Sequence, residues 1–566
     1  MEPAAAAFGV AGRCNGDSDR LPSGADQNRE STMRRWNGWG DEATEFPLRA
    51  SAVRFLRQRI GKGRPLADAD LDQVIESVPR SRLPEHPLVD RSPEIRVRHA
   101  RGQSLGDWLA MRSGQFGVFP DGVARPGDSE QVRQVLDWAL AQGAVVIPYG
   151  GGTSVAGHIN PPVDDRPVLT LSLGAMDRLL RLEPENRLAR FGAGTPGPAL
   201  EAQLREHGFR LGHYPQSWEL STVGGWVASR SSGQQSLLYG RIEQLFAGAR
   251  VETPSGSWRL PTIPASSAGP DAREWLLGSE GRLGVITEVD VRISPLPEFE
   301  QFYVGFVPDW EQARELARRL AQDRPSLSMA RFSNAEETRT QLRLAASPLA
   351  LSALNRYLSL RGCGNGRCMV TFGASGDTAF CRAAVKRASA LVRAHGGVMV
   401  GKSLGKKWEH ARFRSPYLRH GLWEYGYAVD TLETCVEWSK VDDTVSAMEN
   451  AIHAHAGEGE KALVFTHLSH LYPQGSSIYT TYVFRCSPDY EQTRRRWWAM
   501  KEAASDALVA RGGTISHQHG VGRDHRGWLS EEKGTQGLAA LRALAAHFDP
   551  SGQLNPGCLV AEEDRP

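Results

Sequence analysis

The sequence lacks the features that mark several large classes of protein. Its 566 residues include only seven cysteines, at scattered spacings, so neither a disulfide framework nor two paired sets of zinc-binding cysteines is indicated. No stretch approaches the roughly 18 uninterrupted apolar residues that a membrane-spanning helix needs. The formal net charge is +2, so no overall basic field is present to attract nucleic acid. We therefore expect a cytoplasmic globular protein with free thiols and no nucleic-acid partner.

The two ends of the chain carry no address signal. Residues 1–31 are rich in Ala, Gly, Asp and Ser without the basic-then-apolar order of a secretory signal, so we expect a disordered tail. The last residues do not form a peroxisomal Ser-Lys-Leu signal. Residues 32–115 are polar and rich in Pro and Arg, and they predict an N-terminal helical arm. Its Trp- and Gly-containing cluster at 35–40 is interpreted as packing over a domain surface rather than as a catalytic element.

What the chain does have is glycine at three separated bends. They occupy residues 147–157, 220–226 and 278–287, and each sets glycine beside small hydroxyl side chains. Backbone without side chains can bend sharply, and its N–H groups can approach a pyrophosphate closely. One such loop is weak evidence, but three in a fixed order suggest a dinucleotide held by discontinuous segments.

Periodicity predicts an α+β domain at residues 116–298. A helix is expected over 129–142, with Ser129 as its N-cap. The other expected elements are strands at 145–147, 168–171 and 285–293 and a helix at 197–208. The glycine loops then follow strand ends, where ligands commonly bind.

A second α+β domain is predicted at residues 299–500. Its expected elements are helices at 310–320, 378–394 and 492–511, a strand at 369–372 and a hairpin of strands at 462–465 and 477–484. Residues 501–566 form a C-terminal segment that we expect to complete the active site and the first domain. The fold class is therefore a two-domain α+β protein.

Two histidines in the glycine-rich stretch 512–522 are the first candidates for chemistry. His517 and His519 lie two residues apart on a tight loop and can reach one site, although solvated loop histidines are an equal alternative. A zinc site that combines them with His467 and His470 is another alternative. Gln518 stands where an acidic ligand is expected, and Gln is a poor zinc ligand, so we expect no metal.

Two further pairs lie on predicted strands. His467 and His470 are three residues apart, and so are Tyr479 and Tyr482. Residues at i and i+3 of a strand face opposite ways, so each pair should place one side chain in a cleft at most. A tyrosine in such a cleft can shuttle a proton if neighbouring cations lower its pKa.

Cationic side chains provide candidate anion clamps. Arg331, Arg419, Lys406 and Lys407 are the candidates, because a guanidinium grips phosphate or carboxylate through two parallel hydrogen bonds. A lone arginine is more often a surface or ion-pair residue. The short turn before Arg419, with its apolar neighbours, favours an inward orientation.

In their order, these motifs resemble the vanillyl-alcohol oxidase superfamily of proteins with a PCMH-type FAD-binding domain. Within it the chain is similar to the alkyldihydroxyacetonephosphate synthase (alkylglycerone-phosphate synthase) family. The matching stretches are 35–40, 147–155, 212–213, 221–226, 269–271, 278–281, 416–419, 477–479 and 516–522. They run through nearly the whole chain, so the resemblance assigns 116–298 to the FAD-binding domain and 299–500 to the substrate, or cap, domain.

The resemblance implies FAD as the cofactor. Its pyrophosphate would lie on the loop of 150–154, and Thr153 stands where some covalent relatives carry a flavin-linking histidine, so the FAD would be non-covalent. The implied cofactor residues are Pro148, Gly150, Gly151, Gly152, Thr153, Ser154, Pro215, Ser217, Ser221, Thr222, Gly224, Gly225, Glu280, Gly281, Gly284, Val285 and Ile286.

The implied reaction forms an ether lipid precursor. The acyl group of acyl-dihydroxyacetone phosphate leaves as a carboxylate, and a long-chain alcohol replaces it through an adduct at flavin N5. By similarity Tyr479 is the acid/base residue, with a role for His213, and Arg419 grips the carboxylate or the phosphate. Arg331 shapes the site, and His517 and His519 face the substrate phosphate. Cationic side chains suit a phosphate ester on chemical grounds as well.

Two residues depart from the synthase pattern. Gln518 interrupts a row of three histidines, and Gln216 stands where an acidic residue is expected, so either could signal a changed substrate. The alternative is an FAD-linked oxidase or dehydrogenase of a D-2-hydroxyacid. Its metal-dependent members carry acids that the corresponding segments here lack, but 549–557 resembles the oxidases more closely, so both readings stay open. The intact glycines argue against a flavin-less binding protein.

Lipid substrates raise the question of membrane contact. Peripheral contact through the N-terminal arm or through the apolar stretch 344–360 is one reading, and a homodimer is also left open. Pro348 and Arg356 interrupt this stretch, and a core helix is the favoured interpretation.

Overall fold

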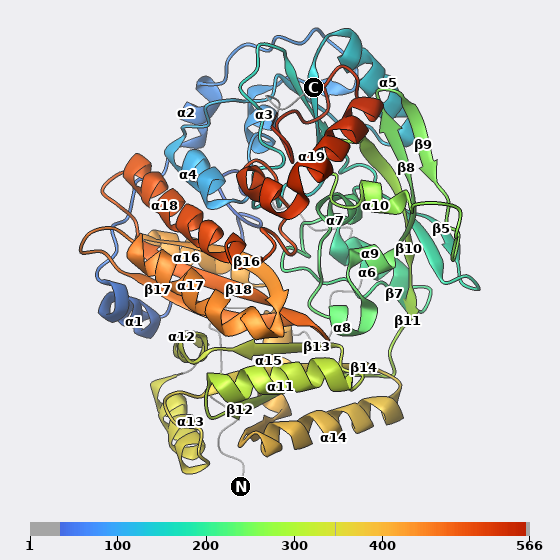
Figure 1. The fold of residues 1–566 in the computed structure, drawn as a ribbon. Helices are drawn as coiled ribbons and strands as arrows, with labels where there is room; N and C mark the ends of the chain where they lie inside the picture. The colour runs from blue at the N-terminus through green and yellow to red at the C-terminus, as the bar shows by residue number, and fades with distance from the viewer. Residues whose placement is uncertain (1–33, 346, 562–566) are drawn as a thin grey trace.

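A computed structural model describes residues 34–345 and 347–561, and the predicted tail lies outside the described residues (Figure 1). The first half of the chain builds two sheets around one apolar core. The first has the order β1 (Val89–Asp90), β2 (Gly122–Ala124), β4 (Val168–Ser172) and β3 (Val145–Tyr149). The second has the order β5 (Leu179–Glu183), β6 (Leu188–Gly192), β10 (Val285–Arg292), β8 (Phe246–Thr253) and β9 (Gly256–Leu260). The pair β7 (Phe209–Arg210) and β11 (Ser294–Pro295) stands apart.

The first half of the chain also contains helices. They are α1 (Ala50–Ile60), α2 (Leu71–Glu76), α3 (Pro93–Arg98), α4 (Leu105–Ser113), α5 (Ser129–Ala141), α6 (Gly197–Arg205), α7 (Val223–Ser229), α8 (Ser236–Tyr239), α9 (Ile242–Leu245) and α10 (Arg273–Leu276). Of these, α1, α4 and α8 pack against elements of the second half. The α5 helix confirms the apolar spacing, since Val132, Val135 and Leu136 are all fully buried. Its N-cap is Asp128, whose carboxylate accepts the Gln131 N–H, so the prediction of Ser129 as the cap is wrong by one residue.

The second half of the chain folds around one larger sheet. Its order is β15 (Val398–Gly401), β12 (Phe299–Val307), β14 (Cys368–Gly376), β13 (Met329–Ser333), β17 (Ala462–Tyr472), β18 (Gly475–Arg485) and β16 (Tyr427–Glu437). The helices of this half are α11 (Trp310–Asp323), α12 (Ala335–Ala345), α13 (Pro348–Leu360), α14 (Thr378–Ala394), α15 (Lys402–Ala411), α16 (Leu418–Glu424), α17 (Val441–Ala454) and α18 (Tyr490–Val509). The predicted hairpin is confirmed as β17 and β18, with longer strands than expected.

The larger sheet has one apolar face and one face directed at the first half. Helices α11, α14 and α17 cover the apolar face (Figure 1). On β18, Ile478 and Tyr482 lie fully buried in that core, whereas Tyr479 and Thr481 point to the other face and line a cavity. The alternation of a strand therefore sorts the two tyrosines as predicted: one is in the core and one is in the cleft.

The C-terminal segment returns to the first half. Helix α19 (Leu529–Phe548) packs there, with Phe548 stacked on Trp258 at 4.8 Å between ring centroids. Beyond it, the Asn555 N–H donates to the Val146 carbonyl at 2.9 Å, so the chain end runs beside β3. Residues more than 400 positions apart thus share one layer beside the first glycine loop.

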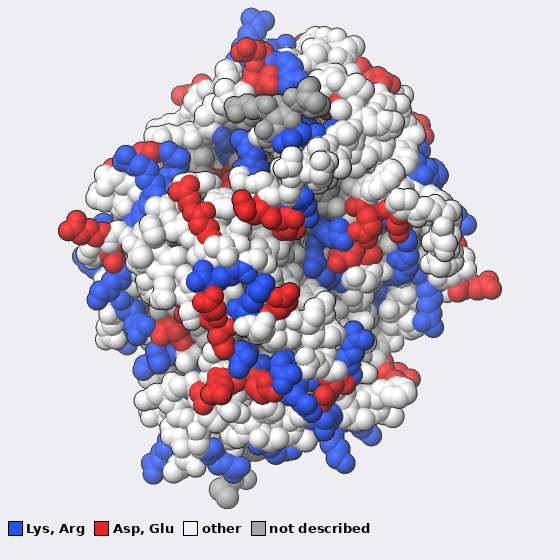
Figure 2. All heavy atoms as spheres, viewed as in Figure 1, with Lys and Arg blue, Asp and Glu red and all other residues white. Residues whose placement is uncertain are grey.

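The apolar stretch 344–360 is not the predicted core helix. It spans the end of α12 and the whole of α13, an amphipathic surface helix. Leu351 and Leu358 are buried, but Leu349 is 87% exposed and Leu360 is 79% exposed. Acidic and basic side chains are interspersed over the visible face of the molecule (Figure 2), in keeping with the small net charge. Within the described ranges, no helix is long and apolar enough to cross a bilayer.

Candidate functional site

A cavity of about 1600 Å³ lies between the glycine loops and the larger sheet. This exceeds the range of about 300–1000 Å³ that is usual for one ligand, so a dinucleotide and a second ligand can share it. The residues predicted to hold FAD that line it are Pro148, Gly150, Gly151, Gly152, Thr153, Ser154, Pro215, Ser217, Ser221, Thr222, Gly224, Gly225, Glu280, Gly281, Gly284 and Ile286. Val285 is the exception, because its side chain is buried in the core behind the wall.

Glycine is required in the first loop by close contact between loops. A Cβ on Gly151 would stand 1.9 Å from the Leu220 carbonyl oxygen, and Gly152 has a φ of +67°. The loop 147–157 can therefore lie directly against 220–226 only with glycine at these positions. The N-terminal arm joins the same point, since Arg34 Nη2 donates to the Gly151 carbonyl at 2.6 Å. Backbone of the two loops thus forms a cradle that a Cβ at Gly151 would disrupt, and the Arg34 side chain holds the arm against it.

Glu280 ties the third glycine loop to the histidine loop. Its carboxylate accepts the N–H groups of Val521 at 2.6 Å and Gly522 at 2.7 Å, and it lies 3.1 Å from His158 Nε2. Burial opposes its ionisation, but His158 and the two amides hold the pKa of Glu280 below its usual value. His158 Nδ1 in turn lies 2.6 Å from Ser154 Oγ in the first loop. A continuous polar chain therefore connects the predicted cofactor loops with residues 517–522.

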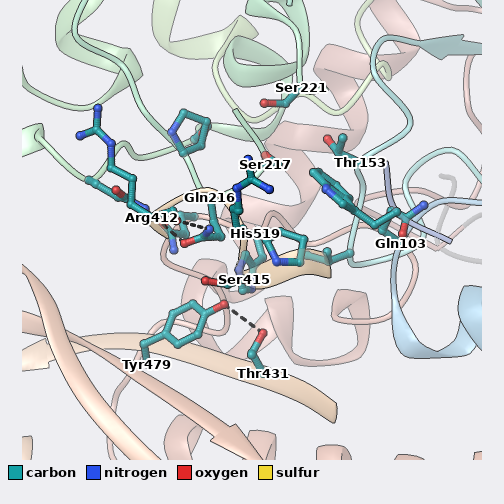
Figure 3. Close-up of a pocket in the computed structure, with 18 of the residues that line it drawn as sticks. Gln103, Thr153, Gln216, Ser217, Ser221, Arg412, Ser415, Thr431, Tyr479 and His519 are labelled. Carbon is teal, nitrogen blue, oxygen red and sulfur yellow. Dashed lines mark hydrogen bonds between the residues drawn. The ribbon is translucent and has the colours of Figure 1, made fainter. Parts of the chain in front are cut away.

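Tyr479 is the phenol of this cavity. Its hydroxyl donates to Thr431 Oγ1 at 3.2 Å (Figure 3), and its ring stacks on His467 with centroids 4.9 Å apart. Burial raises the pKa of Tyr479 to about 12, and nearby Glu433 and Asp430 add to the shift. Arg331 opposes this shift but burial outweighs it, so the condition set for proton shuttling, a lowered pKa, is not met. The phenol is therefore neutral at pH 7 and is suited to donate a proton first.

The two loop histidines diverge. His519 lines the cavity, edge-on to Tyr479 with centroids 5.7 Å apart (Figure 3). His517 is buried behind the wall, where its Nε2 lies 2.7 Å from the Tyr472 hydroxyl. Burial lowers the pKa of His517, although Glu433 opposes the shift. The loop therefore brings one histidine to the site instead of the two predicted.

Both strand histidines face the cavity, which contradicts the expectation of one at most. The register of β17 on β18 shifts between Leu468 and Leu471, so the strict alternation is broken there. His467 and His470 consequently both line the cavity. Burial lowers the pKa of each imidazole, aided by Arg331 at the first and by His517 at the second. Among the described residues, no group of three or more His, Cys, Asp or Glu side chains is arranged to hold a metal ion.

All four predicted cations line the cavity. Arg331 lines the cavity and donates to Glu337, with the same Nη2 3.1 Å from His467 Nδ1. Arg419 also lines it, donates to the Gln103 carbonyl at 2.6 Å and lies 4.6 Å from the Trp108 ring centroid. Lys406 and Lys407 lie in the cavity wall further along.

His213 is set behind the wall. The ring centroids of His213 and Trp226 are 4.8 Å apart. His213 Nε2 lies 3.2 Å from the Oγ of Ser231, and Ser231 lines the cavity. Burial and Arg241 lower the pKa of His213 to about 3, so it is neutral at physiological pH. His213 itself does not line the cavity, and its contact with the lining is through Ser231.

The two departures from the synthase pattern both line the cavity. Gln216 Nε2 donates to the Arg412 carbonyl at 2.6 Å (Figure 3), and its Oε1 accepts from Gln234. An acidic side chain could not donate this bond to Arg412. Gln518 is fixed by its backbone N–H, which donates to Glu433.

Two buried carboxylates beside the cavity were not predicted from the sequence. Glu337 on α12 pairs with Arg331 and His467, and Glu433 on β16 pairs with the histidine loop. Glu433 is buried inside a strand, where Glu is depleted, and this is a signal that could have found it. Glu337 offers no such signal, because acidic residues in the first turn of a helix are common.

Two family descriptions match the chain. Residues 120–260 match an FAD binding domain, and residues 296–559 match the C-terminal domain of FAD linked oxidases. Together the two matched segments cover much of the half with the glycine loops and much of the half with the larger sheet. Residues of both segments line the cavity. The cradle of Gly151 and Gly152 fits the dinucleotide that the first description names.

The similar proteins are named as synthases or as an FAD-linked oxidoreductase. An alkyldihydroxyacetonephosphate synthase of Caenorhabditis elegans is 28% identical over 93% of this chain and 95% of its own length. The synthase of Dictyostelium discoideum is 29% identical over 82% of this chain and 77% of its own. An uncharacterized FAD-linked oxidoreductase of Escherichia coli is 28% identical over 79% and 90%. A solved alkyldihydroxyacetonephosphate synthase superposes with a TM-score of 0.79 at 25% identity, covering 92% of this chain and 98% of that one.

Proposed function

We propose that this FAD-dependent enzyme, which matches an FAD binding domain and the C-terminal domain of FAD linked oxidases, exchanges the acyl group of an acyl-dihydroxyacetone phosphate for a long-chain alcohol. The product is an ether, and the leaving group is a fatty carboxylate. The observation that carries the proposal is the single cavity in which the FAD cradle faces Tyr479, His519 and Arg419.

The walls of the cavity suit a substrate with a charged head and a long chain. Its apolar part includes Val304, Met329 and Met369 on strands of the larger sheet, together with Leu342 on α12 and Leu404 on α15. Its cationic part includes Lys406 and Lys407, and cations in a low-dielectric site stabilise a phosphate ester strongly. A small hydroxyacid would leave the apolar wall without a contact.

The protein groups can manage the protons of this exchange. When bound, FAD supplies a ring nitrogen that can bond reversibly to carbon, so no net oxidation is required. The C1–oxygen bond to the acyl group breaks with its electron pair on the carboxylate, and Arg419 is placed to hold that anion. A new bond then forms between C1 and the alcohol oxygen, which loses its proton. Tyr479, neutral and buried, donates its proton to the departing acyl oxygen as the C1–oxygen bond breaks and recovers it when the fatty acid leaves as a carboxylate, and His519 beside it accepts the alcohol proton.

A second candidate is oxidation of a D-2-hydroxyacid. The observation that favours it is the pair His467 and His470, which both face the cavity and can accept a proton from a hydroxyl group. The similar Escherichia coli oxidoreductase is consistent with redox chemistry in this family.

Two parallel assays separate the candidates. Purified holoenzyme is incubated with palmitoyl-dihydroxyacetone phosphate and hexadecanol, and the ether and palmitate are quantified. A second sample receives D-lactate and related acids with an artificial electron acceptor. Stoichiometric ether and palmitate without acceptor reduction is the expected result. Acceptor reduction by a hydroxyacid, with no ether formed, would contradict the proposal and favour the second candidate.

A further inference from the structure

Glu433 is a buried carboxylate directly beside the phenol of the site. It lies on β16 and pairs in register with Tyr479 on β18, and Tyr479 in turn pairs with His467 on β17. Residues directly opposite on neighbouring strands share one face of a sheet. The side chain of Glu433 is only 3% exposed, so its charge is compensated within the protein.

The compensation comes from the histidine loop. Glu433 Oε1 accepts the backbone N–H groups of Gln518 and His519, the latter at 2.8 Å, and lies 3.4 Å from Ser516 Oγ. Two consecutive amides that converge on one oxygen fix the direction in which the loop leaves the sheet. The side chains of Gln518 and His519 line the cavity from this fixed turn.

Two imidazoles flank the same carboxylate. Oε1 lies 3.7 Å from His519 Nδ1, and Oε2 lies 3.4 Å from His517 Nδ1. Burial opposes ionisation of Glu433, but His519, His517 and the Gln518 amide outweigh it and hold its pKa well below the usual value. The carboxylate is therefore an anion at neutral pH, between one histidine in the cavity and one behind the wall.

We propose that Glu433 is a positioning residue that sets His519 against Tyr479. It holds the loop through two amides and gives the imidazole a fixed negative partner on the side away from the cavity. This role goes beyond the proposed exchange reaction, because it concerns the geometry of the loop and holds for any substrate that uses His519.

The chain offers a matched control for removing this charge. Glu449 on α17 is also a largely buried carboxylate of the same half, but it accepts from Thr466 and Asn334 on the far side of the sheet. Glu433→Gln and Glu449→Gln each exchange a carboxylate for an amide of the same shape. Bound-flavin absorbance and melting temperature establish that both variants are folded.

Amide hydrogen exchange of the holoenzyme tests the loop directly. We expect the amides of Gln518 and His519 to be protected in the unmodified protein and to exchange about tenfold faster or more in Glu433→Gln, with no change in Glu449→Gln. Exchange in the unmodified protein as fast as in an unstructured peptide would overturn the proposal without any variant. So would equal protection in all three proteins.

A double-mutant cycle tests the route to catalysis. We expect Glu433→Gln to lower kcat by about 10-fold to 100-fold, and to lower it no further in a His519→Gln background. An equal loss in both backgrounds would overturn the proposal, since Glu433 would then act independently of His519. The amide measurement does not depend on which reaction the enzyme performs. Failure of ether synthesis with a normal amide result would therefore remove the proposed function and leave the positioning role intact.

Discussion

The two walls of the cavity are specified in different ways. On the glycine-loop wall, backbone makes the surface, and close contact at Gly151 excludes even a methyl group. On the strand wall, side chains of Tyr479, His467 and His519 make the surface, and buried carboxylates stand behind the two histidines. A backbone cradle is fixed by residue type at a few positions, whereas a side-chain array depends on register and on partners far away in the sequence.

The sequence is more informative about the glycine-loop wall than about the strand wall. Glycine patterns report a backbone constraint directly, because few other residues tolerate the conformation. A catalytic side chain reports only its own chemistry, and its direction comes from the sheet that carries it.

The largest effect is expected on the backbone wall. Gly151→Ala places a Cβ 1.9 Å from the Leu220 carbonyl oxygen, so the loops must separate and the FAD cradle opens. We expect the purified variant to contain almost no flavin, measured as the ratio of absorbance at the flavin and protein bands. The matched control is Gly174→Ala, where the nearest atom to a Cβ is 3.9 Å away, and it should be as yellow as the unmodified protein. Full flavin occupancy in Gly151→Ala would contradict the cradle.

On the strand wall, loss of the phenol should stop catalysis without loss of cofactor. Tyr479→Phe removes the proposed acid, and we expect kcat to fall by about 10²-fold to 10⁴-fold while flavin content stays unchanged. Tyr482→Phe, which alters the core side of the same strand, should retain activity. Rates are compared in the ether-forming assay. Equal activity in the two variants would show that the strand does not sort the tyrosines by function.

A smaller effect is expected where the arm meets the glycine loop. Arg34→Ala removes a charged donor to the Gly151 carbonyl, and we expect the Kd for FAD to rise by about 10-fold. Isothermal titration of the apoprotein measures it. Arg35→Ala is the comparison, because Arg35 donates to carbonyls within the arm itself. An unchanged Kd in Arg34→Ala would show that this contact of the arm does not contribute to FAD binding.

The remaining expected effect is on stability at low pH and not on catalysis. Burial lowers the pKa of His213, His420 and His525 to about 3 each. The unfolded chain binds their protons near pH 6.5, so the free energy of unfolding should fall as pH decreases from about 7 toward 4, by up to about 1.4 kcal/mol per pH unit for each histidine. Melting temperatures at pH 8, 7, 6 and 5 measure the slope. His213→Gln should have a shallower slope than the unmodified protein, and identical slopes would contradict the burial of a neutral imidazole.

Much of the fold and of the cofactor wall could be predicted from the sequence. The strands at Val145 and Val168, the helix beginning at Thr378 and the β17–β18 hairpin follow from apolar spacing. The glycine loops predicted a dinucleotide, the resemblance carried by the ordered motifs implied FAD, and the matches to an FAD binding domain and to the C-terminal domain of FAD linked oxidases confirm the cofactor.

The catalytic wall was harder to predict for physical reasons. His470 joins His467 in the cavity because a local register shift breaks the period of two, and no composition signal marked that shift. His517 points away from the cavity because Tyr472 on β17 and Glu433 on β16 hold it, and both partners are far from it in the sequence. α13 looked like a core helix because its composition is apolar, but only one of its faces has a partner.

The central claim is that both walls act on one substrate carbon beside the flavin. The most direct test follows the absorbance of bound flavin under anaerobic conditions. We expect that palmitoyl-dihydroxyacetone phosphate alone changes the flavin spectrum and releases palmitate, and that hexadecanol then restores the spectrum as ether forms. A spectrum that ignores this substrate but is bleached by D-lactate would contradict it.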